Sequence, residues 1–154
     1  MTSTSGRRTL RPAGRSRRLG ASEIAAYCGS KPGTSATRPF GPEPLVFKVA
    51  RKMFALLGRR GGQAAVSLKC DPDRALLLRA SFAAITPGYH LNKEHWNTLA
   101  LDGSLPAQLV EEQIDHSYEL VARTLRRADR ERLTSAASTR PPRRRPGGRK
   151  KSAR

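Results

Sequence analysis

The side chains best suited to chemistry lie together in one stretch, residues 87–101, with the sequence PGYHLNKEHWNTLAL. This stretch contains Trp96, the only Trp of the chain, together with Tyr89 and two of the three His residues, His90 and His95. It opens at a Pro-Gly turn and closes in an apolar run, a pattern typical of a loop that leads into a strand. The stretch is therefore the first candidate for a functional site.

The His and Cys residues do not have the spacing of a metal site. His90 and His95 are five residues apart, and no third ligand follows at a suitable distance. Cys28 and Cys70 form no CxxC pair and do not complete a zinc ligand set. The sequence therefore predicts no metal and no cofactor.

No catalytic constellation is present either. The run Asp115-His116-Ser117 has the letters of a triad, but consecutive residues of a helix point about 100° apart and cannot face one another. His116 is expected to be solvated on its helix. No P-loop, GxSxG or GxGxxG motif occurs, and the acidic residues are scattered. We therefore predict a protein that is not an enzyme.

Binding fits the 87–101 stretch better than catalysis. Lys93 is suited to a phosphate, His90 and Asn92 to polar base edges, and Trp96 to stacking on a base. The same side chains also have a structural interpretation, in which Trp96 packs in the core and Asn92 stabilises a tight turn. The residue types leave both interpretations open, although Trp96 favours the structural one.

Positive charge is concentrated at the two ends of the chain, which has 154 residues and a formal charge of +18. Residues 1–19 carry six Arg and no acid, and residues 140–154 carry eight Lys or Arg and no acid, which leaves +4 for the part between them. Such runs bury too little apolar surface to fold. We predict disordered basic tails at residues 1–20 and 129–154 that attract phosphate backbones without sequence preference, or that only aid solubility.

The remaining composition predicts a cytoplasmic protein. No run approaches the roughly 20 apolar residues that a membrane span needs. The first residues lack the apolar segment of a secretory signal. Two isolated Cys residues make no disulfide framework, as is usual in a reducing compartment.

Residues 21–128 are predicted to form one α+β domain. A Pro-rich loop is expected over residues 34–44, and two-residue and Gly-rich turns at 50–51 and 59–62 join three strands into an antiparallel meander. Consecutive strands with helices around them indicate an antiparallel sheet flanked by helices. The expected elements are a helix over 21–28, strands over 45–49, 52–57 and 64–69, a helix over 71–82, a strand over 96–101, and a helix from 106 to about 125 that then frays.

Several segments follow one another at a spacing that resembles one known family: FKV at 47–49, KMFAL at 52–56, VSLKCDP at 66–72, PGYHLNKEHWNT at 87–98, LDG at 101–103 and SYELV at 117–121. They are similar to the MmcQ/YjbR family of small bacterial proteins, over about residues 22–125. The HLNKxHWN run is the most specific of them. The resemblance implies a CyaY-like (frataxin-like) fold and a DNA-binding protein of the double-wing type, sometimes associated with drug resistance.

Two features of the chain depart from what that resemblance implies. Ala50-Arg51 stands at the first hairpin turn, where the family is expected to have a Gly-Gly pair, and it adds a cation to one candidate wing. The acidic surface with which frataxins handle iron has no counterpart, so iron binding is not carried over.

The leading hypothesis from the sequence is a cytoplasmic, non-enzymatic protein that binds double-stranded DNA with weak sequence preference. It would use its basic hairpin turns and the His90–Trp96 loop, helped by the tails. The alternatives are a small-ligand or drug-binding module, with a pocket among Tyr89, His90, Lys93, His95 and Trp96, and a protein–protein adaptor. The residues expected to contact DNA are Arg51, Lys52, Arg59, Arg60, Lys69 and Lys93 for phosphates, and His90 and Asn92 for polar groups.

Overall fold

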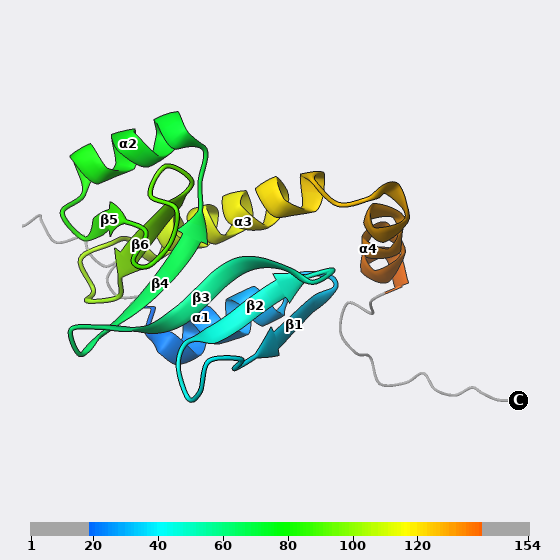
Figure 1. Ribbon diagram of the computed structural model, residues 1–154, viewed down its shortest axis with the longest axis horizontal. Helices are drawn as coiled ribbons and strands as arrows, with labels where there is room; N and C mark the ends of the chain where they lie inside the picture. The colour runs from blue at the N-terminus through cyan, green and yellow to red at the C-terminus, as the bar shows by residue number, and fades with distance from the viewer. Residues whose placement is uncertain (1–18, 140–154) are drawn as a thin grey trace, which may run out of the picture.

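The computed structural model describes residues 19–139, and this part of the chain folds into four helices and one six-stranded sheet (Figure 1). Residues 1–18 and 140–154, which hold most of the two predicted tails, lie outside the described residues. In chain order the elements are α1 (Ala21–Gly29), β1 (Thr34–Thr37), β2 (Leu45–Val49), β3 (Lys52–Arg60), β4 (Gln63–Lys69), α2 (Pro72–Ser81), β5 (Ile85–Pro87), β6 (Trp96–Ala100), α3 (Ala107–Arg123) and α4 (Arg127–Thr139).

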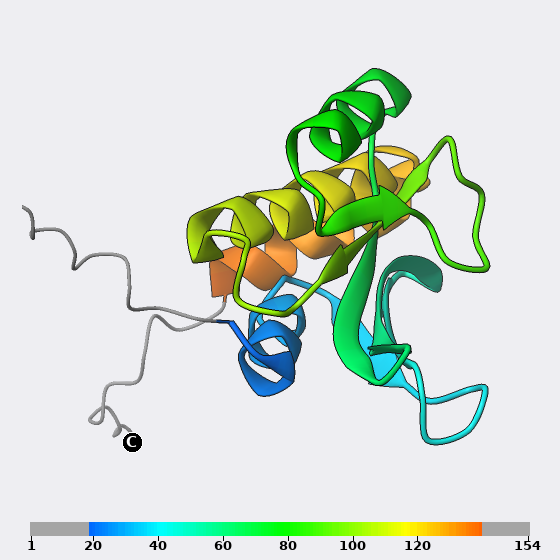
Figure 2. The ribbon, with the colours of Figure 1, turned by 90° about the vertical axis from the view of Figure 1, so that its left-hand side faces the viewer.

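The strands lie in the order β1-β2-β3-β4-β6-β5, and every neighbouring pair is antiparallel. The predicted meander of three consecutive strands is confirmed as β2, β3 and β4. Helices α1 and α3 cover one face of the sheet, whereas the opposite face carries projecting loops (Figures 1 and 2). The predicted α+β fold is therefore confirmed, and one face of its sheet stays open.

Helix α3 is tied to the sheet by its apolar side and by one hydroxyl. Phe54 of β3 meets Tyr118 of α3 edge to face, with ring centroids 5.3 Å apart. Ser117, fully buried beside it, donates to the Phe54 carbonyl (2.6 Å) and accepts from the Lys69 N–H (2.9 Å). Because that hydroxyl bridges two strands, Ser117 has a structural role.

His116, the middle residue of the false triad, is half-buried, so the prediction of a solvated side chain is wrong. Its Nε2 accepts a hydrogen bond from the Asp71 N–H (3.2 Å) at the start of α2. Burial, with the nearby Arg74 charge, lowers the pKa of the imidazole. The packing of the α2 start against α3 causes this burial, and no pattern within α3 alone reveals it.

Two short strands were missed in the sequence. β1 lies within the predicted 34–44 loop and pairs with β2, from Thr34 opposite Val49 to Thr37 opposite Val46. It is an edge strand with three exposed residues in four, so it has no apolar alternation. β5 has three residues and pairs only with β6. Neither is long enough to give a periodic signal.

Helix α4 lies where the sequence predicted the start of a disordered tail, so the prediction of disorder is wrong for residues 129–139. An i,i+4 ion pair joins Arg127 and Glu131 (3.2 Å), and Leu133 packs against the core. Gly33 makes this packing feasible, because its φ is +72° and a Cβ there would overlap the Leu133 side chain. The docking of a single leucine is a tertiary effect that composition does not show.

The β2–β3 turn has the predicted two residues, and both are unusual. Ala50 and Arg51 have φ of 47° and 74°, the left-handed region that a primed turn requires and that Gly or Asn normally fills. A bulge follows where the register shifts between Phe47 and Lys48. It leaves two consecutive residues of β3, Phe54 and Ala55, both in the core.

Candidate functional site

The eight predicted DNA contacts do not gather into one site. Arg51 and Lys52 lie at the β2–β3 turn, and Arg59 and Arg60 lie at the β3–β4 turn. Strand β3, which joins the two turns, has nine residues and therefore spans about 30 Å. The two basic turns are at opposite ends of the sheet (Figure 1).

Asn92 and Lys93 are used to hold the β5–β6 loop, residues 88–95. The Asn92 Oδ1 accepts from the N–H groups of Glu94 (2.9 Å) and His95 (3.1 Å). The Lys93 Nζ donates to the Gly88 carbonyl (3.0 Å) within the same loop. The turn interpretation of Asn92, which the sequence left open, therefore describes its contacts.

The pocket expected among the aromatic, His and Lys side chains of this loop is not formed. Trp96 is buried under the loop, so close to Gly88 that a Cβ at position 88 would lie 2.6 Å from the Trp96 Cβ. Lys93 turns back on the loop, and His95 is half-buried with its carbonyl accepting from the Cys70 N–H (2.8 Å). The structural interpretation of Trp96 is confirmed. Lys69, another predicted contact, is half-buried opposite Trp96 in the β4–β6 pair.

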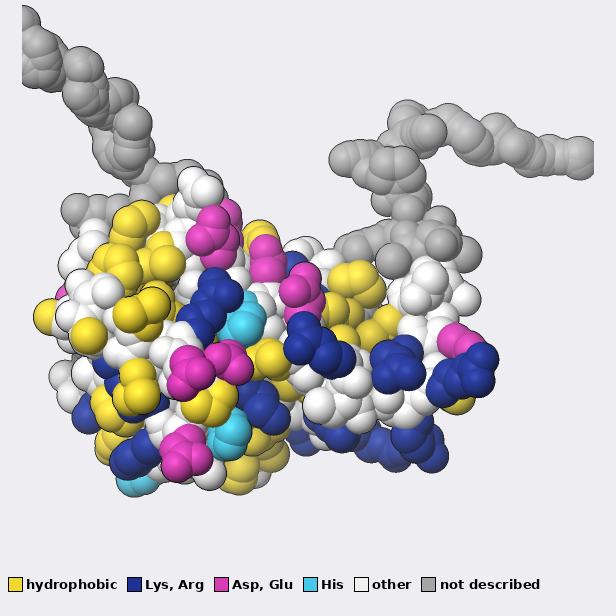
Figure 3. Space-filling model, turned by 90° about the horizontal axis from the view of Figure 1, so that it is seen from above, with side chains coloured by type: hydrophobic (Ala, Val, Ile, Leu, Met, Phe, Trp, Pro, Cys, Tyr) yellow, Lys and Arg dark blue, Asp and Glu magenta, His cyan; other side chains and the backbone are white. Residues whose placement is uncertain are grey.

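A concentration of cations that the sequence did not predict lies where α3, α4 and the β2–β3 turn meet. Residues 51–52 and 123–132 hold seven cations and two acids. The Lys52 Nζ donates to the Thr124 Oγ1 (3.2 Å), which holds the turn against the C-terminus of α3. We call this cluster the basic end, and Figure 3 shows Lys and Arg side chains gathered toward α4. Its cations are Arg51, Lys52, Arg123, Arg126, Arg127, Arg130 and Arg132.

The side chains of the basic end are mostly open to solvent. Arg126, Arg127 and Arg132 are between 75% and 84% exposed, and their ion pairs stay within α4 and its start. Arg130 donates to the carbonyls of Arg123 and Leu125 (3.2 Å each), which joins α4 to the end of α3. A sequence signal for α4 did exist, because Arg127 and Glu131 have the spacing of a helical ion pair.

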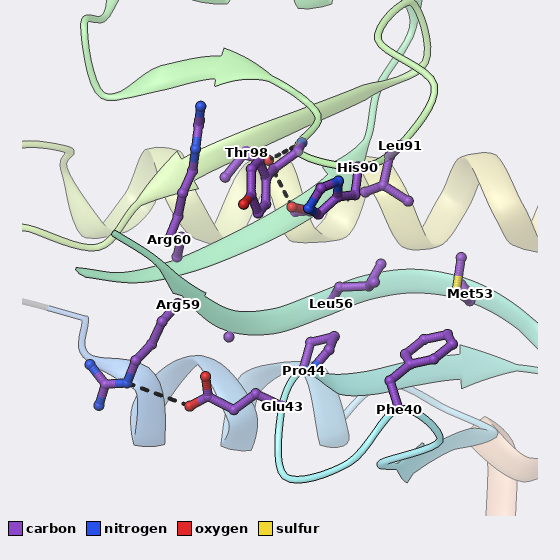
Figure 4. Close-up of a pocket in the computed structure, with 14 residues that line it drawn as sticks. Phe40, Glu43, Pro44, Met53, Leu56, Arg59, Arg60, His90, Leu91 and Thr98 are labelled. Atoms are coloured by element: carbon purple, nitrogen blue, oxygen red, sulfur yellow. Dashed lines mark hydrogen bonds and ion pairs between the residues drawn. The ribbon is translucent and has the colours of Figure 1, made fainter. Parts of the chain in front are cut away.

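A cleft of about 540 Å³ lies on the open face of the sheet. Its two walls are loops that project from that face, residues 38–44 and the β5–β6 loop (Figure 2). Figure 4 shows Phe40 and Pro44 on one wall and His90 and Leu91 on the other, with Leu56 and Met53 between them. The lining is completed by Glu43, Gly58, Arg59, Arg60, Ala65, Ser67, Tyr89 and Thr98.

The polar groups of this cleft are arranged in short chains. At the floor, the hydroxyls of Ser67 and Thr98 are 2.8 Å apart, and the Thr98 Oγ1 accepts from the Tyr89 N–H (3.0 Å). At one end, Arg60 donates to the Thr86 Oγ1 (2.9 Å) and its guanidinium lies 4.8 Å from the Tyr89 ring centroid. Of the predicted contacts, Arg59, Arg60 and His90 therefore belong to this cleft.

The described residues offer little to metal or thiol chemistry. No three His, Cys, Asp or Glu side chains in this part of the chain are grouped so as to share a metal ion. Burial raises the pKa of the Cys28 thiol to about 12 and also raises that of Cys70, so both thiols are protonated at neutral pH. None of the described helices combines the length and apolar character that a membrane span requires.

Comparison with known proteins agrees with the resemblance seen in the sequence. The chain is 39% identical over 98 residues to the uncharacterized protein YjbR of Escherichia coli K12, which covers 64% of this chain and 83% of that protein. It is 37% identical over 95 residues to the uncharacterized protein YbdF of Escherichia coli O157:H7, covering 62% and 78%.

Solved structures show the same similarity. Protein DR2400 of Deinococcus radiodurans matches with a TM-score of 0.68 and 39% identity, over 73% of this chain and 86% of that one. A Pseudomonas syringae protein matches with a TM-score of 0.59 and 30% identity, over 66% and 98%. The family model named YjbR matches residues 29–120, more than half of the chain. The chain belongs to the YjbR family.

Proposed function

We propose that the protein binds double-stranded DNA through the basic end. The observation that carries this proposal is the meeting of the β2–β3 turn with the α3–α4 junction, which brings seven cations and only two acids together. Guanidinium groups bind phosphates in a bidentate manner, and neutralising phosphates releases condensed counterions. The activity is non-enzymatic, needs no cofactor and is expected in the cytoplasm.

The proposed interface keeps only part of the predicted contact set. Arg51 and Lys52 belong to it, and the β2–β3 turn that carries them is a narrow two-residue hairpin. Arg59 and Arg60 lie about 30 Å away along β3, roughly nine base pairs of duplex, so they cannot share a groove contact with Arg51. The proposed interface leaves out Lys93 and Asn92, whose side chains hydrogen-bond within the β5–β6 loop.

Salt-dependent binding of the full chain to a short labelled duplex tests this proposal. Arg51→Gln and Arg127→Gln each remove one exposed cation of the basic end, and the slope of log affinity against log salt should become shallower by about 0.9 for each. In the double variant, the slope should become shallower by about twice as much. Because the wild type and all variants carry the same tails, the contribution of the tails cancels when their slopes are compared.

The matched control is Arg74→Gln, which removes one exposed Arg from α2, outside the basic end. Its slope should equal that of the wild type. If the basic-end variants also keep the wild-type slope, the described fold does not bind DNA through this surface.

A further inference from the structure

We propose that the cleft on the open face of the sheet is a binding site for a small aromatic carboxylate. Its volume of about 540 Å³ is within the range of small-molecule sites, about 300–1,000 Å³. The site is separate from the basic end and does not depend on DNA binding.

The depth of the cleft comes from small side chains on three paired strands. Gly58 of β3 is opposite Ala65 of β4. The next row places Ser67 opposite Thr98. On the opposite face the same strands carry core residues, so small residues here are not required by the core.

The walls offer two aromatic rings that the fold leaves uncovered. Phe40 is 68% exposed on one wall, and Tyr89 is 45% exposed on the other. The Arg60 guanidinium and the His90 ring both contact the Tyr89 ring, at 4.8 Å and 4.0 Å from its centroid. Exposed aromatic rings in a concave site favour a planar, apolar ligand body.

The floor offers a hydrogen-bond donor. Ser67 and Thr98 are both buried, and together their hydroxyls hold two protons. One proton is used in the bond between them, and no hydrogen bond among the described side chains of the floor uses the other, because the Thr98 Oγ1 acts only as acceptor toward the Tyr89 N–H. A buried donor without an acceptor is costly, so a ligand oxygen at the floor would be stabilising.

The charge at the end of the cleft favours an anion. Arg59 and Arg60 line it together with one acid, Glu43. The Arg59–Glu43 pair is long (3.5 Å) and half-exposed on both sides, and such a pair contributes little stability. A ligand carboxylate can therefore displace Glu43 from Arg59 at low cost.

The probe for the test is 2-naphthoate, with neutral 2-naphthamide as its matched control. An NMR titration of the full chain should shift the amides of the floor and of both walls and leave those of α4 unchanged. The amide should bind at least about tenfold more weakly, because it cannot form the charge-assisted hydrogen bonds that a carboxylate forms with a guanidinium. Equal affinities would overturn the proposed preference for an anion.

Three sets of variants locate the probe. Arg59→Gln should weaken naphthoate about tenfold, whereas Arg74→Gln should not change it. Ala65→Leu should abolish binding by filling the floor. Ser67→Ala and Thr98→Val each keep one hydroxyl donor, and only the double variant removes both, so its loss should exceed the sum of the single losses.

The proposal is overturned if the probe shifts no cleft amide up to its solubility limit, or if Ala65→Leu binds it like the wild type. If Thr98→Val disturbs the β5–β6 loop, the NMR signal of the Tyr89 amide will shift in the free protein. In that case the Arg59 and Ala65 variants still test the proposal. DNA affinity of the Ala65→Leu variant should equal that of the wild type, so the two sites can fail independently.

Discussion

One substitution in the β2–β3 turn is expected to raise the stability of the fold and to weaken the proposed DNA binding. Arg51 has a φ of 74° and an exposed side chain, so replacing it with Gly removes strain without removing packing. A left-handed conformation costs a non-Gly residue about 1–2 kcal/mol. The greater chain entropy of Gly in the unfolded state takes back about 0.5–1 kcal/mol. Arg51→Gly should therefore raise the free energy of unfolding by roughly 0.5–1 kcal/mol.

Urea denaturation measured by far-UV circular dichroism, with a thermal melt, detects this change. For a fold of this size the melting temperature should rise by roughly 2–5 °C. The same substitution removes one cation of the basic end, so the salt slope of DNA binding should become shallower by about 0.9. A variant that is more stable and binds more weakly cannot owe its weaker binding to unfolding.

Ala50→Gly is the matched control, because it relieves the neighbouring left-handed residue (φ 47°) and keeps the charge. Its gain in stability should be smaller, since the Ala50 methyl packs against the core, and its DNA affinity should be unchanged. If Arg51→Gly lowers the free energy of unfolding, the turn does not hold this conformation. If it leaves the salt slope unchanged, Arg51 is not a phosphate contact.

Three further predictions concern other contacts. Burial lowers the pKa of His116 in the folded state, so its neutral form stabilises the fold above pH 6.5. This stabilisation is lost as the pH falls through the folded-state pKa. His116→Gln should remove that pH-dependent loss, measured by urea denaturation at several pH values between about 5 and 7. Gly33→Ala should destabilise the fold and release α4, with a partial recovery of stability on adding Leu133→Ala, measured as a double-mutant cycle. Asn92→Ala should cost about 1 kcal/mol of unfolding free energy and leave the DNA salt slope unchanged, whereas Asn92→Asp should retain the turn; a change in slope would return Asn92 to the interface.

The elements with strong local signals were predictable from the sequence. The Asp71-Pro72 start of α2 combines a capping side chain with a Pro at the first turn, and the structure confirms both. The apolar spacing from Val110 to Val121 predicted α3 and its buried face. In both cases the information is carried by residues within one or two turns of each other.

The elements that were missed depend on distant partners. β1 exists because its backbone pairs with β2, and its exposed Thr and Ser residues give no pattern. α4 is held where it is by Leu133 beside Gly33, a contact across one hundred residues of chain. Charge composition alone assigned this region to the tail, although its Arg residues form helical ion pairs with Glu131 and Asp129.

In the candidate site, as in the fold, residue types were visible in the sequence but the contacts of each side chain were not. The sequence singled out the β5–β6 loop, and two of the three side chains that it assigned to binding there, Asn92 and Lys93, hydrogen-bond within the loop. The polar and aromatic side chains that suggested binding instead hold the loop in place; they are those of Asn92, Lys93 and Trp96. What the loop presents to the cleft is Tyr89 and His90, together with Leu91.

The backbone of the β5–β6 loop explains why polar side chains are concentrated in it. The loop crosses an open sheet face without a helix behind it, so its backbone groups need partners that regular structure does not supply. The Asn92 amide satisfies two N–H groups and the Lys93 ammonium satisfies the Gly88 carbonyl. Thr98 satisfies the Tyr89 N–H from below. The concentration of polar side chains in this loop therefore follows from its backbone, and the surface that it holds in place is the cleft.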